Sequence, residues 1–312
     1  MATAVELETF VSSVARPADF DSFWRGALAE LRSVPLEPEL SPVRLRSTPE
    51  VNVYEVHYRS LGGVRIASWY CVPARGSGPF PALIQFPGYK GEPALPRNWA
   101  QRGVATLSVA VRGKLRSHDQ FNPGYPGLLT NGIESPSTYA YRGVISDCVR
   151  GIDFLLTRAE VSKERIFAHG SSQGGGLTLV TTALRPEIKG GAAACPFLCG
   201  FPDAMKLARS YPYNELNCYL RAYPDRKEQA LATLSYFDAV NFTGRIRCPM
   251  AVGIPLEDEV CPPQTQYAAY RNLAGPKEVW LIPNAAHGSP AEYLDKESAW
   301  LQRLIGFATA RT

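Results

Sequence analysis

Two adjacent serines, Ser171 and Ser172, stand among glycines in the stretch FAHGSSQGGGL, residues 167–177. A serine hydroxyl is well placed to attack a carbonyl carbon when a sharp strand-to-helix turn exposes it, and that turn requires small residues two positions before and two positions after the serine. Around Ser172 these positions are Gly170 and Gly174, whereas around Ser171 they hold histidine and glutamine. The spacing therefore predicts that Ser172 is a nucleophile.

Glycine-rich turns after a strand have other uses. A phosphate-binding loop would read GxxxxGK[ST], and a dinucleotide-binding loop would read GxGxxG near the first strand of the sheet. Neither pattern fits here, because the motif follows the third or fourth parallel strand that the sequence predicts. The motif favours a hydrolase over a turn that only packs a helix against the sheet.

A serine hydroxyl needs a general base, which a carboxylate in turn orients. On a sheet of this kind the chain order is Ser, then Asp or Glu, then His. Of the four histidines, His287 is the one that follows Ser172. It lies in NAAHGS, directly after the apolar stretch EVWLIP, so the order and the context both predict His287 as the base.

The acid is expected after the preceding apolar stretch, PMAVGIP, where the chain continues as LEDEV. This turn holds Glu257, Asp258 and Glu259, and the spacing leaves all three open. Other acids nearby, such as Asp238, do not follow a strand directly and are expected to be caps or surface residues.

A developing oxyanion needs two backbone N–H donors in a serine hydrolase. One is expected from Gln173, the residue after the nucleophile, and the other from the loop PGYKG after an early strand. In that loop Tyr89 is the natural donor, because the flanking glycines allow the backbone to approach the substrate.

The elements that would position these residues alternate between short apolar runs and helices, a pattern typical of a mainly parallel sheet covered on both faces. An antiparallel hairpin, residues 43–59 and 64–73 with the turn at Gly62 and Gly63, precedes them. The predicted later strands are 81–86, 105–111, 165–170, 190–198, 249–255 and 278–283, and the predicted helices include 17–32, 142–158, 264–274 and 290–308.

We expect residues 1–312 to form a single α/β domain, since no linker or repeat interrupts the pattern. Two segments depart from the alternation. Residues 113–141 are rich in Gly, Pro, Asn and Ser, and a loop of this length is usually functional or forms an interface. Residues 201–245 are interpreted as a small helical insertion.

The composition limits the compartment and the partners. The chain has 45% hydrophobic residues and a net charge of +4 from interspersed charges, which does not favour nucleic acid or a membrane as partner. The N-terminus has no basic start before an apolar core, so it is not expected to be a secretory signal. Seven scattered cysteines favour reduced thiols and a cytoplasmic protein, and the pair Cys195 and Cys199 lacks the further ligands of a zinc site.

Several stretches together give a more specific resemblance. The chain resembles the acetyl xylan esterase and cephalosporin C deacetylase family (carbohydrate esterase family 7) in RPADFDSFWRGALAEL, PGYKG, VRGKLRS, LLTNGIESPSTYAYRGVISDCVRGIDFL, GSSQGGGL and LEDEVCPP. The resemblance implies an α/β-hydrolase fold and removal of acetyl groups from small acetylated carbohydrates and related esters, with no metal or organic cofactor. It implies Asp258 as the acid, three residues before Cys-Pro-Pro, and it matches Ser172, His287, Tyr89 and Gln173 to the family's nucleophile, base and oxyanion donors. It also implies a homo-oligomer, commonly a hexamer, with 113–141 as part of an interface.

The chain departs from the family pattern at Pro87, Lys114 and Gly288, where the family usually has His, Gln and Glu. These departures bear on substrate preference, so a broad-specificity short-chain carboxylesterase is the alternative. A non-catalytic interaction protein is a third possibility, which the ordered Ser, Asp and His disfavour. Arg112 and Ser117 keep their motif positions, and we interpret them as structural support of the site.

Overall fold

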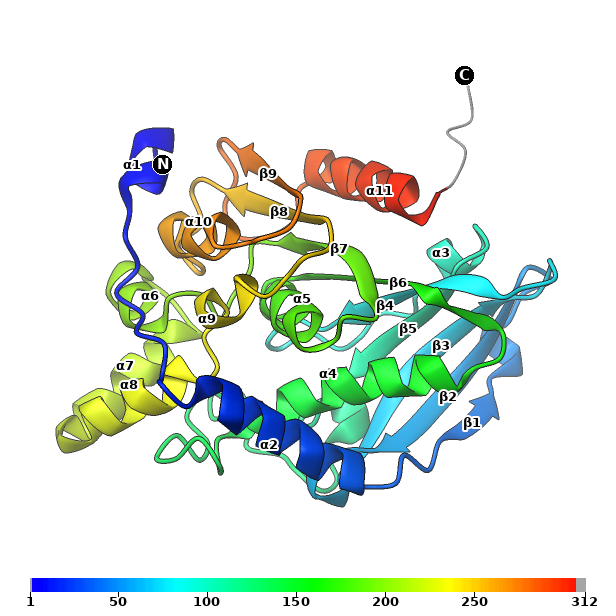
Figure 1. The fold of residues 1–312 in the computed structure, drawn as a ribbon, viewed down its shortest axis with the longest axis horizontal. Helices are drawn as coiled ribbons and strands as arrows, with labels where there is room; N and C mark the ends of the chain where they lie inside the picture. Colours follow the sequence, from blue (N-terminus) through cyan, green and yellow to red (C-terminus); the bar gives the residue numbers. More distant parts are fainter. Residues whose placement is uncertain (1, 307–312) are drawn as a thin grey trace.

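A mostly parallel sheet runs through the middle of the molecule (Figure 1). In residues 2–306, which a computed structural model describes, it has nine strands in the order β1-β2-β3-β5-β4-β6-β7-β8-β9. The pairs among β1, β2 and β3 and the pair β3–β5 are antiparallel, and all pairs from β5 across to β9 are parallel. The strands are β1 (Glu39–Pro42), β2 (Val51–Arg59), β3 (Arg65–Pro73), β4 (Phe80–Phe86), β5 (Ala105–Ala110), β6 (Val161–Ser171), β7 (Ile188–Ala194), β8 (Met250–Pro255) and β9 (Lys277–Ile282).

Helices cover both faces of this sheet. On one face α4 and α5 pack against the strands and α2 packs outside α4, while α3 and α11 cover the other face (Figure 1). The predicted α/β fold class is thus confirmed. The helices are α1 (Ala4–Thr9), α2 (Phe20–Ser33), α3 (Arg97–Ala100), α4 (Ala140–Thr157), α5 (Gln173–Leu184), α6 (Phe201–Leu207), α7 (Tyr213–Ala222), α8 (Lys227–Ser235), α9 (Val240–Thr243), α10 (Pro263–Arg271) and α11 (Ala291–Ile305).

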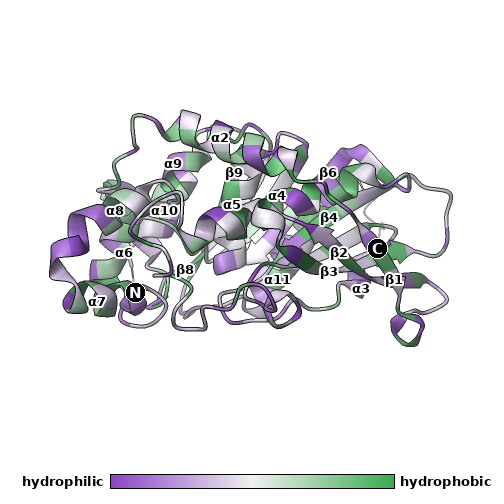
Figure 2. Cartoon of the chain, turned by 90° about the horizontal axis from the view of Figure 1, so that it is seen from below, coloured by the Kyte–Doolittle hydropathy of each residue, from purple (hydrophilic) through white to green (hydrophobic). Residues whose placement is uncertain are grey.

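The strand β4 illustrates why short apolar runs make this sheet. Successive side chains of a strand point to opposite faces, so a strand covered on both sides must be apolar at almost every position. Ala82, Ile84 and Phe86 join the larger core under α4 and α5, whereas Leu83 joins the smaller core under α11. Hydrophobic residues accordingly lie along the strands in Figure 2, and hydrophilic ones gather on the outer turns of α7 and α8.

Two predicted strands are partly wrong. The predicted strand 190–198 ends early, because β7 stops at Ala194. The first half of 43–59 is not a strand, because Arg44–Arg46 form a 3-10 turn and Glu39–Pro42 pair with β2 instead. The alternation of apolar and polar residues in VRLRS suggested a strand, but Leu45 is fully exposed and has no packing partner. The last two residues of the predicted helix 290–308 lie outside the described residues.

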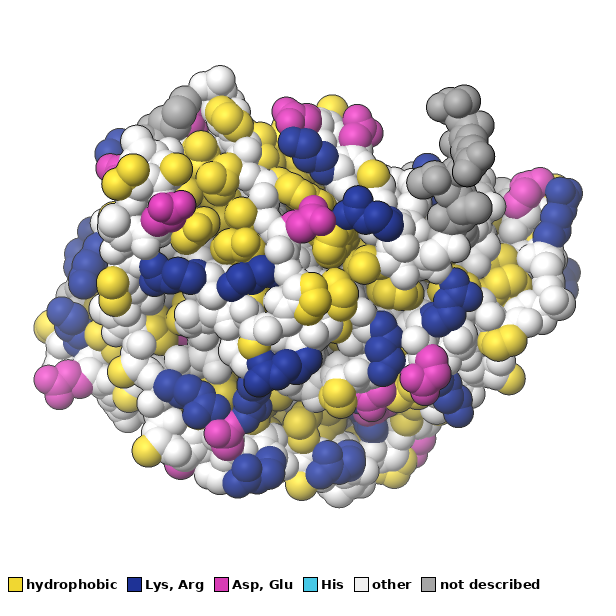
Figure 3. Space-filling model, turned by 45° about the horizontal axis from the view of Figure 1, so that its top comes forward, with side chains coloured by type: hydrophobic (Ala, Val, Ile, Leu, Met, Phe, Trp, Pro, Cys, Tyr) yellow, Lys and Arg dark blue, Asp and Glu magenta, His cyan; other side chains and the backbone are white. Residues whose placement is uncertain are grey.

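The two segments that interrupt the alternation lie at the edge of this core. Residues 201–245 contain α6 to α9, and residues 113–139 run through turns with one short 3-10 helix, Leu115–Ser117. In the part of the chain that the structure describes, the helices are too short or too polar to cross a bilayer. Basic and acidic side chains are interspersed over the face in Figure 3 and form no block of one sign.

Candidate active site

Ser172 stands at a sharp turn between β6 and α5. Its φ of 59° and ψ of −121° are rare for a residue with a side chain, which identifies a strained turn of the kind that exposes a nucleophile. A Cβ at Gly170 would lie closer than 3.0 Å to the Gly174 backbone, and a Cβ at Gly174 would lie closer than 3.0 Å to the Phe86 carbonyl. Both glycines are therefore required by crowding, as the motif predicts.

We expect Gly174→Ala to lower the free energy of unfolding by about 3 kcal/mol and to reduce esterase activity. The added methyl meets a backbone carbonyl of β4, which cannot move aside without shifting the strand. The matched control is Gly26→Ala in the exposed part of α2, where a Cβ meets nothing within 4 Å. That substitution is expected to raise stability by about 0.5–1 kcal/mol, because alanine favours the helix. Urea unfolding of both variants measures the difference, and equal effects would contradict the assigned crowding.

His287 lies between Ser172 and Asp258. Its Nε2 is 3.0 Å from Ser172 Oγ and its Nδ1 is 2.8 Å from Asp258 Oδ2. An ionised carboxylate can only accept a hydrogen bond, so Nδ1 carries the proton of a neutral ring and Nε2 presents its lone pair to the serine hydroxyl. Three side chains that are far apart in the sequence thus form one hydrogen-bonded chain.

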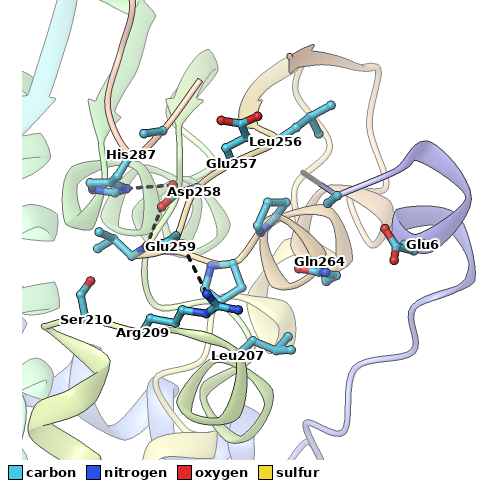
Figure 4. Close-up of a pocket in the computed structure, with 15 residues that line it drawn as sticks. Glu6, Leu207, Arg209, Ser210, Leu256, Glu257, Asp258, Glu259, Gln264 and His287 are labelled. Atoms are coloured by element: carbon cyan, nitrogen blue, oxygen red, sulfur yellow. Dashed lines mark hydrogen bonds and ion pairs between the residues drawn. The ribbon is translucent and has the colours of Figure 1, made fainter. Parts of the chain in front are cut away.

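The turn after β8 fixes the carboxylate. Asp258 is buried, and its Oδ1 accepts hydrogen bonds from the backbone N–H groups of Val260 and Cys261. Its Oδ2 accepts from Gln266 Nε2 at 3.1 Å as well as from His287. Of the three acids in LEDEV, Asp258 is the one that points to the ring, as Figure 4 shows; the other two are exposed.

The neighbouring serine has a different environment. Ser171 Oγ lies 3.1 Å from Ser289 Oγ and 3.3 Å from Cys195 Sγ, and no contact joins it to the imidazole among the described residues. Ser171 therefore ties the elbow to the loop that carries His287. The hydroxyl within hydrogen-bond distance of His287 is that of Ser172, whose role as the nucleophile stays a prediction.

The two expected oxyanion donors lie on adjoining segments. Gln173 is the first residue of α5, where a backbone N–H has no partner within the helix. Its side-chain Nε2 lies 3.4 Å from the carbonyl oxygens of Pro87 and Gly88, so the loop that carries Tyr89 rests against the elbow. Tyr141 Oη donates to Gln173 Oε1 at 2.7 Å and holds that amide in place.

The side chain of Tyr89 is anchored by the long loop 113–139 and by α7. Its hydroxyl donates to Glu215 Oε2 at 2.5 Å and accepts from the Leu129 N–H at 3.3 Å, and burial raises the pKa of the phenol. Glu215, on α7, also accepts from the N–H groups of Gly127 and Thr130. The helical segment 201–245 and the long loop 113–139 therefore both hold the loop that carries Tyr89 in position.

Arg112 and Ser117 flank residues 113–116, at the start of the long loop. The Arg112 guanidinium makes a two-pronged contact with Asp147, at 2.8 and 3.0 Å, and a Cβ at Gly143 would collide with it. Ser117 Oγ donates to the Ala110 carbonyl and accepts from the Ala67 N–H, which joins β5 to β3. These contacts hold both ends of the loop between them; that the two residues support the site stays a prediction.

A cleft of about 810 Å³ opens beside the imidazole (Figure 4). The turn after β8, the end of α6 and the N-terminal segment line it, with His287 and Asp258 at one end. Arg209 and Glu259 form an ion pair across its wall at 3.8 Å. Ser172 is not among the residues that line this cleft, so the cleft adjoins the site at His287 and Asp258. Its volume is large enough to accept a sugar-sized group on that side of the imidazole.

One group in the described residues has the composition of a metal site. The donor atoms of Cys195, Asp258 and His287 lie within 4.8 Å of one another. Burial raises the pKa of the Cys195 thiol to about 11, which disfavours the thiolate that a metal ion needs. Since Asp258 and His287 already share a hydrogen bond, we assign no metal there; that catalysis needs no cofactor stays a prediction.

Several residues that shape the site were not singled out from the sequence for that role. Each makes a buried hydrogen bond to a predicted site residue: Tyr141 to Gln173, Glu215 to Tyr89, and Gln266 to Asp258. Tyr141 and Glu215 are separated from their partners by 32 and 126 positions, so no local spacing could reveal them. Gln266 is only eight residues after Asp258 and lies in the first turn of α10. The predicted helix 264–274 could therefore have suggested that its side chain lies close to Asp258.

A serine, a histidine and a carboxylate at the carboxyl ends of β6, β9 and β8 in this sheet define an α/β-hydrolase. The sequence profile of the acetyl xylan esterase family (AXE1) matches residues 3–304, and the chain belongs to that family. It is thus a carboxylic ester hydrolase of the acetyl esterase type.

Individual proteins agree with this placement. The acetyl esterase Axe7A of Xylanibacter ruminicola is 29% identical over 304 residues, which are 93% of this chain and 67% of that protein. The acetyl xylan esterase of Paenibacillus sp. R4 has a TM-score of 0.91 at 34% identity and covers 97% of this chain and 99% of its own. Acetyl xylan esterase 1 of Thermoanaerobacterium sp. JW/SL YS485 has a TM-score of 0.91 at 26% identity, over 98% and 99% of the two chains.

Proposed function

We propose that this chain removes acetyl groups from small acetylated carbohydrates through an acetyl-serine intermediate on Ser172. The observation that carries the proposal is the hydrogen-bonded chain from Ser172 Oγ through both ring nitrogens of His287 to Asp258. Ser172 attacks the ester carbonyl while His287 Nε2 takes its proton, and Asp258 holds the ring and stabilises the imidazolium. The alcohol then leaves with the proton from His287.

The second half of the reaction repeats these roles with water. His287 takes a proton from the water, which attacks the acetyl carbonyl, and acetate leaves as Ser172 Oγ regains the proton. In both halves the N–H groups of Tyr89 and Gln173 receive the oxyanion. Their place on the loop after β4 and at the start of α5 supports this role.

The relatives and the cleft support the proposed preference for acetylated sugars. The names of two solved relatives specify acetyl xylan, and a cleft of about 810 Å³ beside His287 has room for the alcohol part of such a substrate. We extend the proposal to cephalosporin C, whose acetyl ester is likewise carried on a bulky polar group.

A panel of p-nitrophenyl esters of rising chain length tests the acetyl preference. We expect kcat/KM to fall about tenfold from acetate to propionate and about 100-fold or more to butyrate, because each added methylene must fit a site made for a methyl group. Acetylated xylo-oligosaccharide and cephalosporin C, assayed by acetate release, provide the natural alcohols. Similar rates from acetate to hexanoate would instead identify a broad-specificity short-chain carboxylesterase.

We also propose that the protein acts in the cytoplasm as a homo-oligomer, a hexamer by family resemblance. All seven cysteines are free, and five of them are buried, which is usual where thiols stay reduced. The long segment 113–141 is the proposed contact, and light scattering on the purified protein measures the assembly mass.

A further inference from the structure

Lys114 is a buried charge that the proposed reaction does not use. Its side chain is fully buried, and it replaces the glutamine that the family usually has at this position. The Nζ atom donates to the carbonyl oxygens of Gly88, at 2.7 Å, and Tyr89, at 2.5 Å, and lies 4.8 Å from the centre of the Tyr125 ring. Because burying an ammonium group is unfavourable unless it is well paired, its position requires an explanation.

The explanation lies in one peptide group. The Gly88 carbonyl, which accepts from Lys114, and the Tyr89 N–H, which is the proposed oxyanion donor, belong to the same peptide bond. A cation hydrogen-bonded to the carbonyl oxygen polarises the whole amide, so the N–H becomes a stronger donor. Gln173 Nε2, at 3.4 Å from the same oxygen, acts in the same sense.

We propose that Lys114 is a positioning residue for ester hydrolysis, whose ammonium group holds and polarises the Gly88–Tyr89 peptide and so strengthens the Tyr89 N–H toward the oxyanion. This inference rests on the proposed function. A purely structural link between two carbonyls would need only a neutral donor such as an amide. The charge itself acts on the transition state, where negative charge develops on the substrate oxygen.

The charge on Lys114 depends on pH. Burial lowers the pKa of this group from 10.5 to about 8, and the carboxylate of Glu92, on the loop after β4, opposes that effect. The Tyr125 ring also faces it, and the Tyr89 phenol packs against that ring. Burial raises the pKa of both phenols, so they stay neutral in this range. Glu215 is engaged by the Tyr89 hydroxyl. Above about pH 8 the lysine becomes a neutral amine that still donates but no longer carries charge.

Stability and activity should then change in opposite directions. Between pH 8 and 10.5 the unfolded chain keeps the proton of Lys114 while the folded protein has lost it, so this group makes the protein more stable as the pH rises. The folded protein loses this charge with a midpoint near pH 8, which weakens the oxyanion donor, so kcat falls as the stability begins to rise. A lysine with only a structural role would not produce this opposition.

The experiment compares the wild type with Lys114→Gln, which keeps a neutral donor, and Lys114→Met, which keeps the volume alone. We expect kcat for an acetyl ester at pH 7 to fall by about 10- to 100-fold in both, less than the loss of a whole oxyanion donor, with KM within about threefold. The wild-type kcat should fall with a midpoint near pH 8, and neither variant should show that decrease. Lys90→Gln, an exposed lysine of the same loop, is the matched control and should behave as the wild type.

Three results would overturn the inference. They are a Lys114→Gln variant with the wild-type kcat, a variant that keeps the alkaline decrease, and a wild-type kcat that is constant from pH 7 to 10. All three can be obtained without the Met variant, so they test the inference even where Lys114→Met fails to fold. Ser172→Ala is assayed in parallel. An inactive Ser172→Ala beside a normal Lys114→Gln rejects only the role of the lysine, whereas an active Ser172→Ala rejects the proposed function.

Discussion

Replacing Ser172 by alanine should reduce kcat for acetyl ester hydrolysis by about 10⁴- to 10⁶-fold, because no acetyl-enzyme can form without the hydroxyl. The remaining activity would come from the oxyanion donors and substrate binding. Stopped-flow release of p-nitrophenol from p-nitrophenyl acetate measures both the burst and the steady state. We expect the burst to disappear and KM to change little.

Ser171→Ala is the matched control for this prediction. Ser171 hydrogen-bonds to Ser289 and Cys195 at the back of the elbow, so its removal is expected to change kcat less than about tenfold. A burst that persists in Ser172→Ala and disappears in Ser171→Ala would reverse the assignment of the nucleophile. Circular dichroism of both variants checks that the fold is retained.

Asp258→Asn is expected to reduce kcat by about 10⁴-fold while the geometry stays nearly intact. Oδ1 accepts from two backbone N–H groups, so the asparagine amide must keep its oxygen there. Its NH₂ group then faces His287 Nδ1, which can only accept from it. The ring proton moves to Nε2, and the lone pair that would take the proton of Ser172 is lost.

Two exposed acids of the same turn provide the control for Asp258→Asn. Glu257→Gln and Glu259→Gln make the same change from carboxylate to amide without touching the ring, and they should keep kcat within about threefold. The pH dependence of kcat/KM and the rates of all three variants can be measured with one substrate. A loss of 10⁴-fold in Glu257→Gln, with a normal Asp258→Asn, would contradict the proposed role of the carboxylate.

The sequence predicted the parts of the site that are set locally or by chain order. The glycines at 170 and 174 identify Ser172 because the elbow crowds the backbone at both positions. His287 followed from being the remaining histidine after the nucleophile. Asp258 did not follow from spacing, since three acids share the turn; the family resemblance was needed to select it.

The supporting contacts of the site depend on tertiary packing that no local pattern encodes. Glu215 lies on α7 and reaches Tyr89 across 126 positions, and Lys114 reaches the Gly88 carbonyl across 26. In both cases a polar side chain is buried against a distant loop, whereas its residue type alone predicts an exposed position. The sequence did single out Lys114 as a departure from the family, but its contact with the oxyanion loop comes from the structure.

The fold was predicted best where burial is continuous. The inner strands β4, β5, β7 and β8 and the second half of β6 are mostly apolar because helices cover both faces, so their runs stand out in the sequence. At the edge of the sheet the pattern is weaker, and residues 43–50 look like a strand although Arg44–Arg46 turn away from it. Alternation without a partner surface does not determine a strand.

Labelling with an organophosphate ester is the most direct test of the central claim, that Ser172 is the activated nucleophile. The folded protein is incubated with diethyl p-nitrophenyl phosphate, digested, and the modified residue is located by fragmentation mass spectrometry. We predict one diethylphosphoryl group on Ser172, formed at a rate that falls in Asp258→Asn, and none in Ser172→Ala. A label on Ser171, or none on a protein that still hydrolyses acetyl esters, would contradict the account.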